Sequence, residues 1–234
     1  VSEMNLSDAE KKKRAGLASR KPYVAKKLSK ISENENKGII SPIIRIEKSY
    51  LCNFQCTHCS AEYYMDRHLE KKLNTKEHRD QMTIEDIKNI SKQADELGLA
   101  RFVITGGEAL LDRNLEDLIK VLDPYKHLII LDTNGFYFNE EKAKWFAGLG
   151  GYKVQISLDS MYAEEHDAFR NTKGAHARAL NAFKVAKEAG SEVLLSTCLV
   201  RDRVFSKEFE LLCDFCEKEE IPLYVTLAKP VGSA

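Results

Sequence analysis

Short apolar segments alternate with amphipathic segments about six times along the chain. The apolar segments have the length and residue types of β-strands, which predicts six of them: Ile43–Glu47, Arg101–Thr105, His127–Leu131, Tyr152–Leu158, Glu192–Leu199 and Leu223–Leu227. The amphipathic segments predict helices at Thr83–Leu97, Asn114–Leu122, Asn139–Ala147, Ala177–Ala189 and Ser206–Lys218. Thr83 and Asp86 form a capping signal at the start of the first of these helices, and Gly98 follows its end.

Alternating strands and helices indicate parallel βαβ units with right-handed crossovers. Six units are too few for a closed eight-stranded barrel. The sequence therefore predicts an α/β fold, a partial (βα)6 TIM-like barrel whose wide mouth admits a larger substrate than a closed barrel does. We expect residues 43–234 to form this barrel and residues 1–42 to form an N-terminal helical extension. The charged segment 61–81 is predicted to be a long functional loop.

The 234 residues contain 36 Lys and Arg and 36 Asp and Glu, so the formal net charge is zero. This balance argues against a nucleic-acid-binding protein. Residues 1–30, however, hold nine basic and three acidic side chains. We expect a solvated, partly helical basic arm there, with docking to an acidic partner as the alternative.

The sequence predicts neither a membrane span nor a secretion signal, because it has no run of 18 apolar residues and no charged segment leading into an apolar one. Its six cysteines are clustered unevenly and do not resemble a disulfide framework. Unpaired thiols favour a reducing cytoplasmic setting.

Three cysteines, Cys52, Cys56 and Cys59, follow the first predicted strand with C-x3-C-x2-C spacing. A fully protein-ligated [4Fe–4S] cluster takes four cysteines. Three thiolates on one loop can hold three irons and leave the fourth open to an outside ligand, as a catalytic metal site requires.

Three further polar motifs follow the next three predicted strands, at the rim where parallel barrels build their sites. They are Thr105-Gly106-Gly107-Glu108, Asp132-Thr133-Asn134-Gly135 and Gln155-Ile156-Ser157-Leu158-Asp159-Ser160. Paired glycines allow a close backbone approach, and a carboxylate can receive an ammonium group. Ser157 and Asp159 are two residues apart and project to the same side of an extended chain. A plain Gly-Gly turn and an Asn-Gly turn are the alternative readings of the first two motifs.

Together these motifs resemble those of the radical S-adenosylmethionine (SAM) superfamily, over about Ile43–Leu227. The resemblance implies a [4Fe–4S] cluster on the three cysteines and SAM as the second cofactor. It implies that Gly106, Gly107 and Glu108 meet the SAM amino group and that Ser157 and Asp159 contact SAM. Arg170, in the segment His166–Arg170, is implied to pair with the SAM carboxylate, since a planar guanidinium suits bidentate pairing. Thr133 or Asn134 is a further candidate contact.

The chain departs from the family pattern at two positions. Ala109 stands where the family usually has proline, and His58 stands where many members place an aromatic ring that packs near adenine. The flat ring of His58 can stack in the same way. The remaining histidines, His68, His78, His127, His166 and His176, are expected to be solvent-facing or structural.

The resemblance implies reductive cleavage of SAM to a 5′-deoxyadenosyl radical that abstracts hydrogen from the substrate, with flavodoxin or ferredoxin as the low-potential electron donor. The ending Ala228–Ala234 resembles the stretch that closes the barrel in relatives with a SPASM or twitch extension. Those relatives often modify peptides or protein side chains, so a peptide substrate is predicted. A radical SAM enzyme of small-molecule biosynthesis, molybdopterin- or deazapurine-forming, is the leading alternative.

Two other uses of the cysteines compete with this interpretation. A non-catalytic zinc module would combine Cys56 and Cys59 with His68 or His78, but it leaves Gly107–Glu108 and Ser157–Asp159 unexplained. Cys213 and Cys216, with Cys198 nearby, could hold a second cluster. Because Phe209, Leu212, Cys213 and Cys216 lie on one helical stripe, core packing is favoured.

Overall fold

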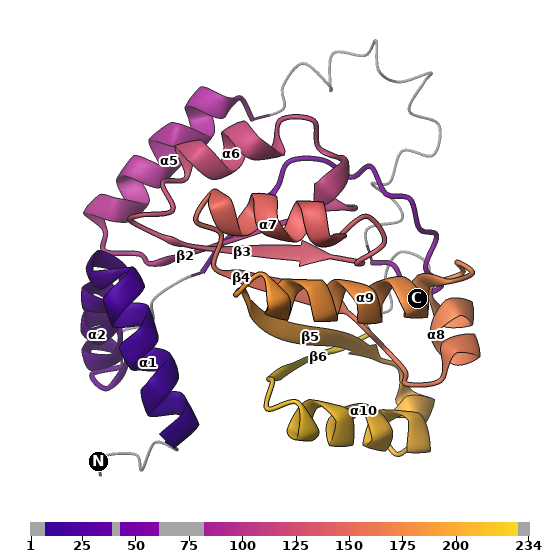
Figure 1. Ribbon diagram of the computed structural model, residues 1–234. Coiled ribbons are helices and arrows are strands. Elements are labelled where there is room, and N and C mark those ends of the chain that lie inside the picture. Colours follow the sequence, from indigo (N-terminus) through magenta and orange to yellow (C-terminus); the bar gives the residue numbers. More distant parts are fainter. Residues whose placement is uncertain (1–7, 39–42, 61–81, 229–234) are drawn as a thin grey trace.

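The computed structural model describes residues 8–38, 43–60 and 82–228. Six parallel strands form one sheet in the order β1-β2-β3-β4-β5-β6. Their bounds are β1 Ile44–Glu47, β2 Arg101–Thr105, β3 Leu128–Thr133, β4 Lys153–Ser157, β5 Glu192–Leu199 and β6 Leu223–Leu227. Spatial order equals chain order, so each strand lies beside the next, and the sheet curls into a half-barrel with β1 and β6 at its edges (Figure 1). The predicted partial barrel is confirmed.

Helices cover the outer face of this sheet (Figure 1). They are α5 Ile84–Glu96, α6 Leu115–Val121, α7 Glu140–Gly148, α8 Ala163–Phe169, α9 Ala175–Glu188 and α10 Lys207–Lys218, with short 3₁₀ turns η1 Ala109–Leu111 and η2 Arg201–Arg203. The capping signal before α5 is confirmed, because Thr83 Oγ1 accepts from Asp86 N at 3.1 Å and Asp86 Oδ2 accepts from Thr83 N at 2.8 Å. The predicted loop 61–81 and the closing segment 229–234 lie outside the described residues.

The two faces of the sheet differ in polarity. Alternate strand residues such as Phe102, Ile129 and Ile156 are fully buried against the helices in the main core. The intervening residues point to the inner face, and on β4 these are Lys153, Gln155 and Ser157, which are only partly buried. Parallel strands are usually apolar on both faces. The polar inner positions of β4 therefore indicate that the barrel encloses a cavity on this side of the strand rather than a packed core.

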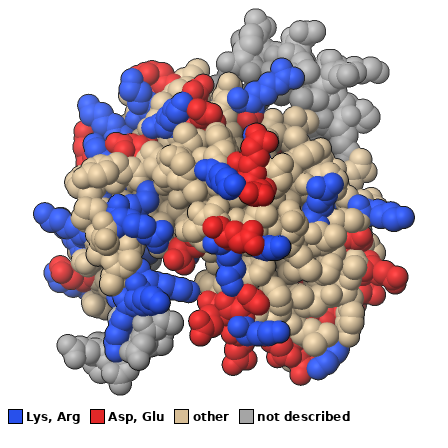
Figure 2. Space-filling model, viewed as in Figure 1, with Lys and Arg blue, Asp and Glu red and all other residues tan. Residues whose placement is uncertain are grey.

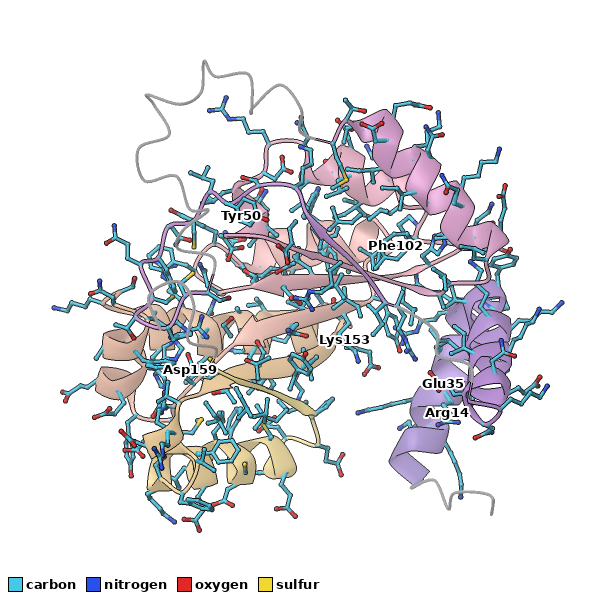
Figure 3. All side chains as sticks on the ribbon, turned by 180° about the vertical axis from the view of Figure 1, so that it is seen from behind. Arg14, Glu35, Tyr50, Phe102, Lys153 and Asp159 are labelled. Atoms are coloured by element: carbon cyan, nitrogen blue, oxygen red, sulfur yellow. The ribbon has the colours of Figure 1, made fainter. Side chains whose placement is uncertain are left out.

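The N-terminal extension forms two helices, α1 Asp8–Arg20 and α2 Pro22–Glu35. Leu17, Val24 and Ile31 pack with Ala100 and Leu128 at the amino-terminal ends of β2 and β3. In Figure 3, Arg14 and Glu35 of this extension lie at the opposite end of the sheet from Tyr50 and Asp159. The extension thus closes the base of the barrel, away from the rim where the motifs lie.

The basic residues of this extension are not all solvated, contrary to the simplest expectation. Lys27 is 8% exposed, donates to the carbonyls of Leu99 and Lys126 at 3.0 Å each, and pairs with Asp95 at 2.6 Å. Lys21 donates to the carbonyls of Pro124 and Gly150. These ammonium groups satisfy carbonyls at the barrel base, so they hold the extension in place.

Surface charges of both signs are interspersed on the helical face of the molecule (Figure 2). No helix in the described part of the chain is both long and apolar enough to cross a membrane.

Candidate cofactor site at the barrel rim

The three predicted cluster ligands line one cavity of about 500 Å³ at the carboxyl ends of the strands. Cys52, Cys56 and Cys59 are each partly exposed on the loop that follows β1, here called the cysteine loop (residues 52–59). Phe54, 2% exposed, packs edge-on against Phe136 with ring centroids 5.7 Å apart. This buried ring anchors the loop at the rim.

Gly106 and Gly107 bring the end of β2 against the chain that leads into the cysteine loop. Gly107 N donates to Ser49 O at 2.9 Å and Glu108 N to Leu51 O at 2.8 Å. A Cβ at Gly106, whose φ is +131°, would lie 2.2 Å from Ser49 O, and one at Gly107 would lie 2.4 Å from Leu51 O. The paired glycines predicted a close approach of the backbone to a neighbour, and in the structure that neighbour is the protein segment from Ser49 to Leu51. Both glycines also line the cavity.

Glu108 joins the ends of β2 and β3. Its carboxylate is 2% exposed and accepts from Thr133 Oγ1 and Asn134 N at 2.8 Å each and from Leu110 N at 3.1 Å. Burial raises the pKa of Glu108, and these hydrogen bonds oppose the shift. Glu108 is not among the residues that line the cavity. Its carboxylate therefore fixes the positions of Thr133 and Asn134 from outside the cavity.

Asn134 serves both a turn and the cavity. Its Oδ1 accepts from Phe136 N at 2.9 Å, as in an Asx-turn, and Gly135 follows with φ +80°. Its Nδ2 donates to Asn53 Oδ1 of the cysteine loop at 2.9 Å. Thr133 and Asn134 both line the cavity. The motif therefore forms the expected turn and also lines the cavity, and a contact of Thr133 or Asn134 with SAM stays a prediction.

Ser157 and Asp159 lie at different depths. Ser157 lines the cavity, but Asp159 is fully buried and does not. The Asp159 carboxylate accepts from Arg170 Nε at 2.5 Å, Thr197 Oγ1 at 3.2 Å and Cys198 N at 3.1 Å. Burial alone would raise the pKa of Asp159, yet the charge of the Arg170 guanidinium and its hydrogen bond lower it to about 2. Asp159 is thus an ionised group placed behind Arg170.

Arg170 lies on the cavity wall between Asp159 and the cysteine loop. Its Nη1 is 3.9 Å from Cys56 Sγ, within the range of a weak hydrogen bond to sulfur. The preceding residue, Phe169, accepts through its carbonyl from Thr57 N at 3.2 Å. The end of α8 therefore holds the cysteine loop at both its backbone and a sulfur.

His58 stacks on Phe169, with ring centroids 3.9 Å apart and planes 11° from parallel. Phe169 thus covers one face of the His58 ring, which the sequence predicted to stack near adenine, and the His58 side chain still lines the cavity. Burial lowers the pKa of His58 to about 4, so the ring is neutral at physiological pH. The core histidines His127 and His166 are fully buried, as the structural reading expected.

Several inner-wall residues were assigned no role by sequence reasoning. Arg45 lines the cavity together with Asp132 and Gln155, the first residues of two of the motifs, and Cys198, Tyr224 and Thr226 line its far side. For Gln155 and Cys198, the signal that could have found them is the two-residue alternation of inward-facing side chains within β4 and β5. Cys213 and Cys216 lie on α10, with Cys216 in the main core, and neither lines the cavity.

The donor set fits a cluster better than a single ion. Among the described residues, no three Cys, His or carboxylate side chains are placed to hold one metal ion. The zinc alternative draws on His68 or His78, which lie outside the described residues. A cubane cluster separates its thiolates more widely than one ion does, and three soft thiols on one loop suit iron and sulfide. Burial raises the pKa of Cys52 to about 11. Cluster binding must therefore release thiol protons.

The fold and rim define a class of protein: a partial α/β barrel that offers three thiols and a polar cavity to cofactors. A family model described as the Radical SAM superfamily matches residues 46–216, and the chain belongs to that superfamily. Members of this superfamily use a [4Fe–4S] cluster together with SAM, also called AdoMet.

Two curated relatives and one solved structure illustrate the similarity. The chain is 26% identical over 178 residues to the AdoMet-dependent heme synthase of Oleidesulfovibrio alaskensis, covering 74% of this chain and 43% of the relative. It is 28% identical over 195 residues to the GTP 3′,8-cyclase of Clostridium perfringens, covering 81% and 56%. The crystal structure of Streptococcus suis SuiB bound to precursor peptide SuiA has a TM-score of 0.64 at 18% identity, covering 98% of this chain and 48% of that one. The chain thus spans about half the length of these proteins.

Proposed function

We propose that this chain is the catalytic barrel of a radical SAM enzyme. Cys52, Cys56 and Cys59 hold the [4Fe–4S] cluster, and the cavity beside them holds SAM. When bound and reduced, the cluster supplies the electron that cleaves SAM, and the resulting 5′-deoxyadenosyl radical takes hydrogen from the substrate. The supporting observation is that all three cysteines line the same polar cavity as the other rim motifs.

The predicted SAM-binding residues divide into two groups by position. Those proposed to touch SAM line the cavity: His58, Gly106, Gly107, Asn134, Ser157 and Arg170. Glu108 and Asp159 are proposed to act as positioning residues, because their carboxylates are buried and already accept hydrogen bonds from rim residues.

The proposed substrate is a peptide or protein side chain. The half-barrel leaves its cavity open, which suits a bulky substrate. Two arginines line the cavity, and each is paired with a carboxylate: Arg45 with Asp132 and Arg170 with Asp159. A triphosphate such as that of GTP favours several cations whose charge is not already neutralised. The charge balance of this wall therefore favours a substrate without phosphates.

The electron donor is proposed to be a flavodoxin or ferredoxin, and the setting a reducing cytoplasm. The partly exposed cysteine loop gives such a donor a short path to the cluster. The six cysteines are clustered unevenly and do not resemble a disulfide framework, which agrees with a reducing compartment.

The test is anaerobic iron–sulfur reconstitution, reduction with dithionite in the presence of SAM, and chromatography for 5′-deoxyadenosine. We expect formation by the wild type, none by Cys56→Ala, and wild-type formation by the matched control Cys213→Ala, whose side chain lies on α10 away from the cavity. A reconstituted wild type that leaves SAM intact would refute the proposal.

A second experiment tests the substrate class. A short peptide encoded beside the gene is incubated with the reduced enzyme and SAM, and its mass is compared before and after. A mass change that requires SAM supports the peptide proposal. Turnover of GTP with no change in the peptide would instead support the small-molecule alternative.

A further inference from the structure

Arg170 lies between a buried carboxylate and one of the three predicted cluster sulfurs. Its Nε donates to Asp159 Oδ2 at 2.5 Å, and a different nitrogen of the same group, Nη1, lies 3.9 Å from Cys56 Sγ. The Arg170 side chain is 11% exposed and that of Asp159 is fully buried, so water screens these charges only weakly. The ion pair therefore presents its positive partner to the sulfur.

Neighbouring contacts hold the guanidinium and the sulfur at this separation. Thr57 N and Thr57 Oγ1 both donate to the carbonyl of Phe169, at 3.2 and 3.1 Å. These two residues are the chain neighbours of Cys56 and Arg170. The Asp159 carboxylate is held in turn by two donors from β5. The order carboxylate, guanidinium, sulfur is thus fixed from both ends.

A charge beside a cluster sulfur changes how easily the cluster takes up an electron. Reduction adds one negative charge, and the reduction potentials of iron–sulfur clusters depend on net charge and on hydrogen bonds to the sulfurs. A cation next to a ligand sulfur stabilises the reduced form and so raises the potential, whereas an anion paired with that cation has the opposite effect. Groups that surround metal ligands commonly tune the metal in this way.

We propose that Arg170 raises the reduction potential of the cluster through its contact with Cys56, and that Asp159 limits this effect by neutralising part of the Arg170 charge. The proposal rests on the proposed function, because it requires the cluster on the three cysteines. It adds a second role to Arg170, whose five N–H groups can hold Asp159, approach Cys56 and still donate to SAM. The ion pair thus makes the cluster easier to reduce by a donor of limited reducing power.

An EPR-monitored redox titration of the reconstituted protein measures this potential directly. SAM is left out, so the contact proposed between Arg170 and the SAM carboxylate does not contribute. We expect Arg170→Gln to lower the midpoint potential, with about tenfold less reduced relative to oxidised cluster at the wild-type midpoint, which corresponds to about 59 mV for one electron. We expect Asp159→Asn to raise the midpoint, because it leaves the permanent charge of Arg170 uncompensated.

The opposite signs distinguish tuning of the cluster from a purely structural role. Both substitutions break the same ion pair, so mere loosening of the rim would move the two midpoints in the same direction. The matched control is Arg45→Gln, which removes a charge from the same cavity wall. Arg45 pairs with Asp132 at 2.8 Å, and its side chain is 45% exposed, so solvent screens its charge. This control should leave the midpoint unchanged.

A measurement on the wild type alone needs no variant to fold. Protein labelled with ¹⁵N only in arginine is reconstituted and reduced, and pulsed EPR records the hyperfine coupling between the cluster spin and nearby nitrogen nuclei. We expect an arginine coupling in the wild type, because Arg170 Nη1 lies 3.9 Å from Cys56 Sγ.

Three results would overturn the proposal: equal midpoints for the wild type and Arg170→Gln, shifts of the same sign in Arg170→Gln and Asp159→Asn, or no arginine coupling in the wild type. Failure of the proposed function is a separate result. A chain that binds no cluster overturns both, whereas a reduced cluster that leaves SAM intact overturns the proposed function alone, because the potentials are measured without SAM.

Discussion

Replacing Asp159 with asparagine should loosen the whole cofactor rim. Asp159 is fully buried, accepts from Arg170 Nε at 2.5 Å, and through its own carbonyl accepts from Arg203 Nη2 at 2.6 Å. Removing one partner of a buried ion pair costs about 3–5 kcal/mol, and asparagine keeps the shape and one acceptor. We therefore expect Asp159→Asn to lower the free energy of unfolding by about 3 kcal/mol.

Urea denaturation of the cluster-free protein, followed by far-UV circular dichroism, measures this change. A double-mutant cycle with Arg170→Met isolates the pair, and we expect the two substitutions to be non-additive by about 2 kcal/mol. Glu140→Gln is the matched control, because it breaks the fully exposed pair of Glu140 with Lys144 and should leave the midpoint unchanged. An Asp159→Asn protein as stable as the wild type, or a strictly additive cycle, would refute the reasoning.

The pH dependence gives an independent check on the same pair. The pKa of Asp159 is lowered from 3.8 to about 2, so the folded state holds its carboxylate ionised more strongly than the unfolded state does. This contribution, about 2 kcal/mol, is fully present above pH 3.8 and is lost as the pH falls toward 2. The stability difference between wild type and Asp159→Asn should therefore shrink as the pH is lowered through that window. A difference that grows on acidification contradicts the assignment.

Three further changes have expected outcomes. Gly106→Ala places a Cβ 2.2 Å from a backbone oxygen at φ +131° and should destabilise the protein by about 3 kcal/mol and reduce bound iron per chain, whereas Gly148→Ala, with nothing within 4 Å, should do neither. Lys27→Met removes the ammonium group that donates to two carbonyls at the barrel base and pairs with Asp95, so it should lower the urea midpoint, while Lys30→Met on the exposed face of α2 should not. Burial raises the pKa of Asp132 from 3.8 to about 6, so between these pH values the folded state binds more protons than the unfolded state does. The wild type should therefore lose stability relative to Asp132→Asn as the pH rises from 3.8 to 6.

The order of strands and helices could be predicted from the sequence because each outward face carries a strong apolar repeat. The bounds of β2, β5 and β6 were predicted to the residue. β3 begins at Leu128 rather than His127, because the backbone N of His127 donates to Asp123 O in the turn that ends α6. The seven-residue helix α8 was missed, since its sequence AEEHDAF shows almost no apolar periodicity.

The rim was predicted less completely, because spacing identifies residue types but not their depth. The motifs placed Ser157 and Asp159 on one side of the chain, yet the strand ends at Ser157, which lines the cavity, whereas Asp159 is fully buried and does not. Arg170 follows from its motif, but its contact with Cys56 joins residues 114 positions apart, and no local pattern carries that information. Likewise, the role of Lys27 in holding the barrel base depends on the carbonyls of two distant loops.

The cysteine loop is held from three directions, and this bears on how the cluster is assembled. Ser49 and Leu51, just before the loop, bond to the end of β2, whereas Asn53 bonds to the turn after β3 and Thr57 to the end of α8. A loop fixed by its own contacts does not need the metal to order it, unlike small zinc domains that fold only with metal. The three thiols can therefore be presented before iron arrives, and the energy of cluster binding need not be spent on folding the barrel. The same contacts make the rim a cooperative unit, because displacing the end of β2, the turn after β3 or the end of α8 moves the sulfur ligands with it.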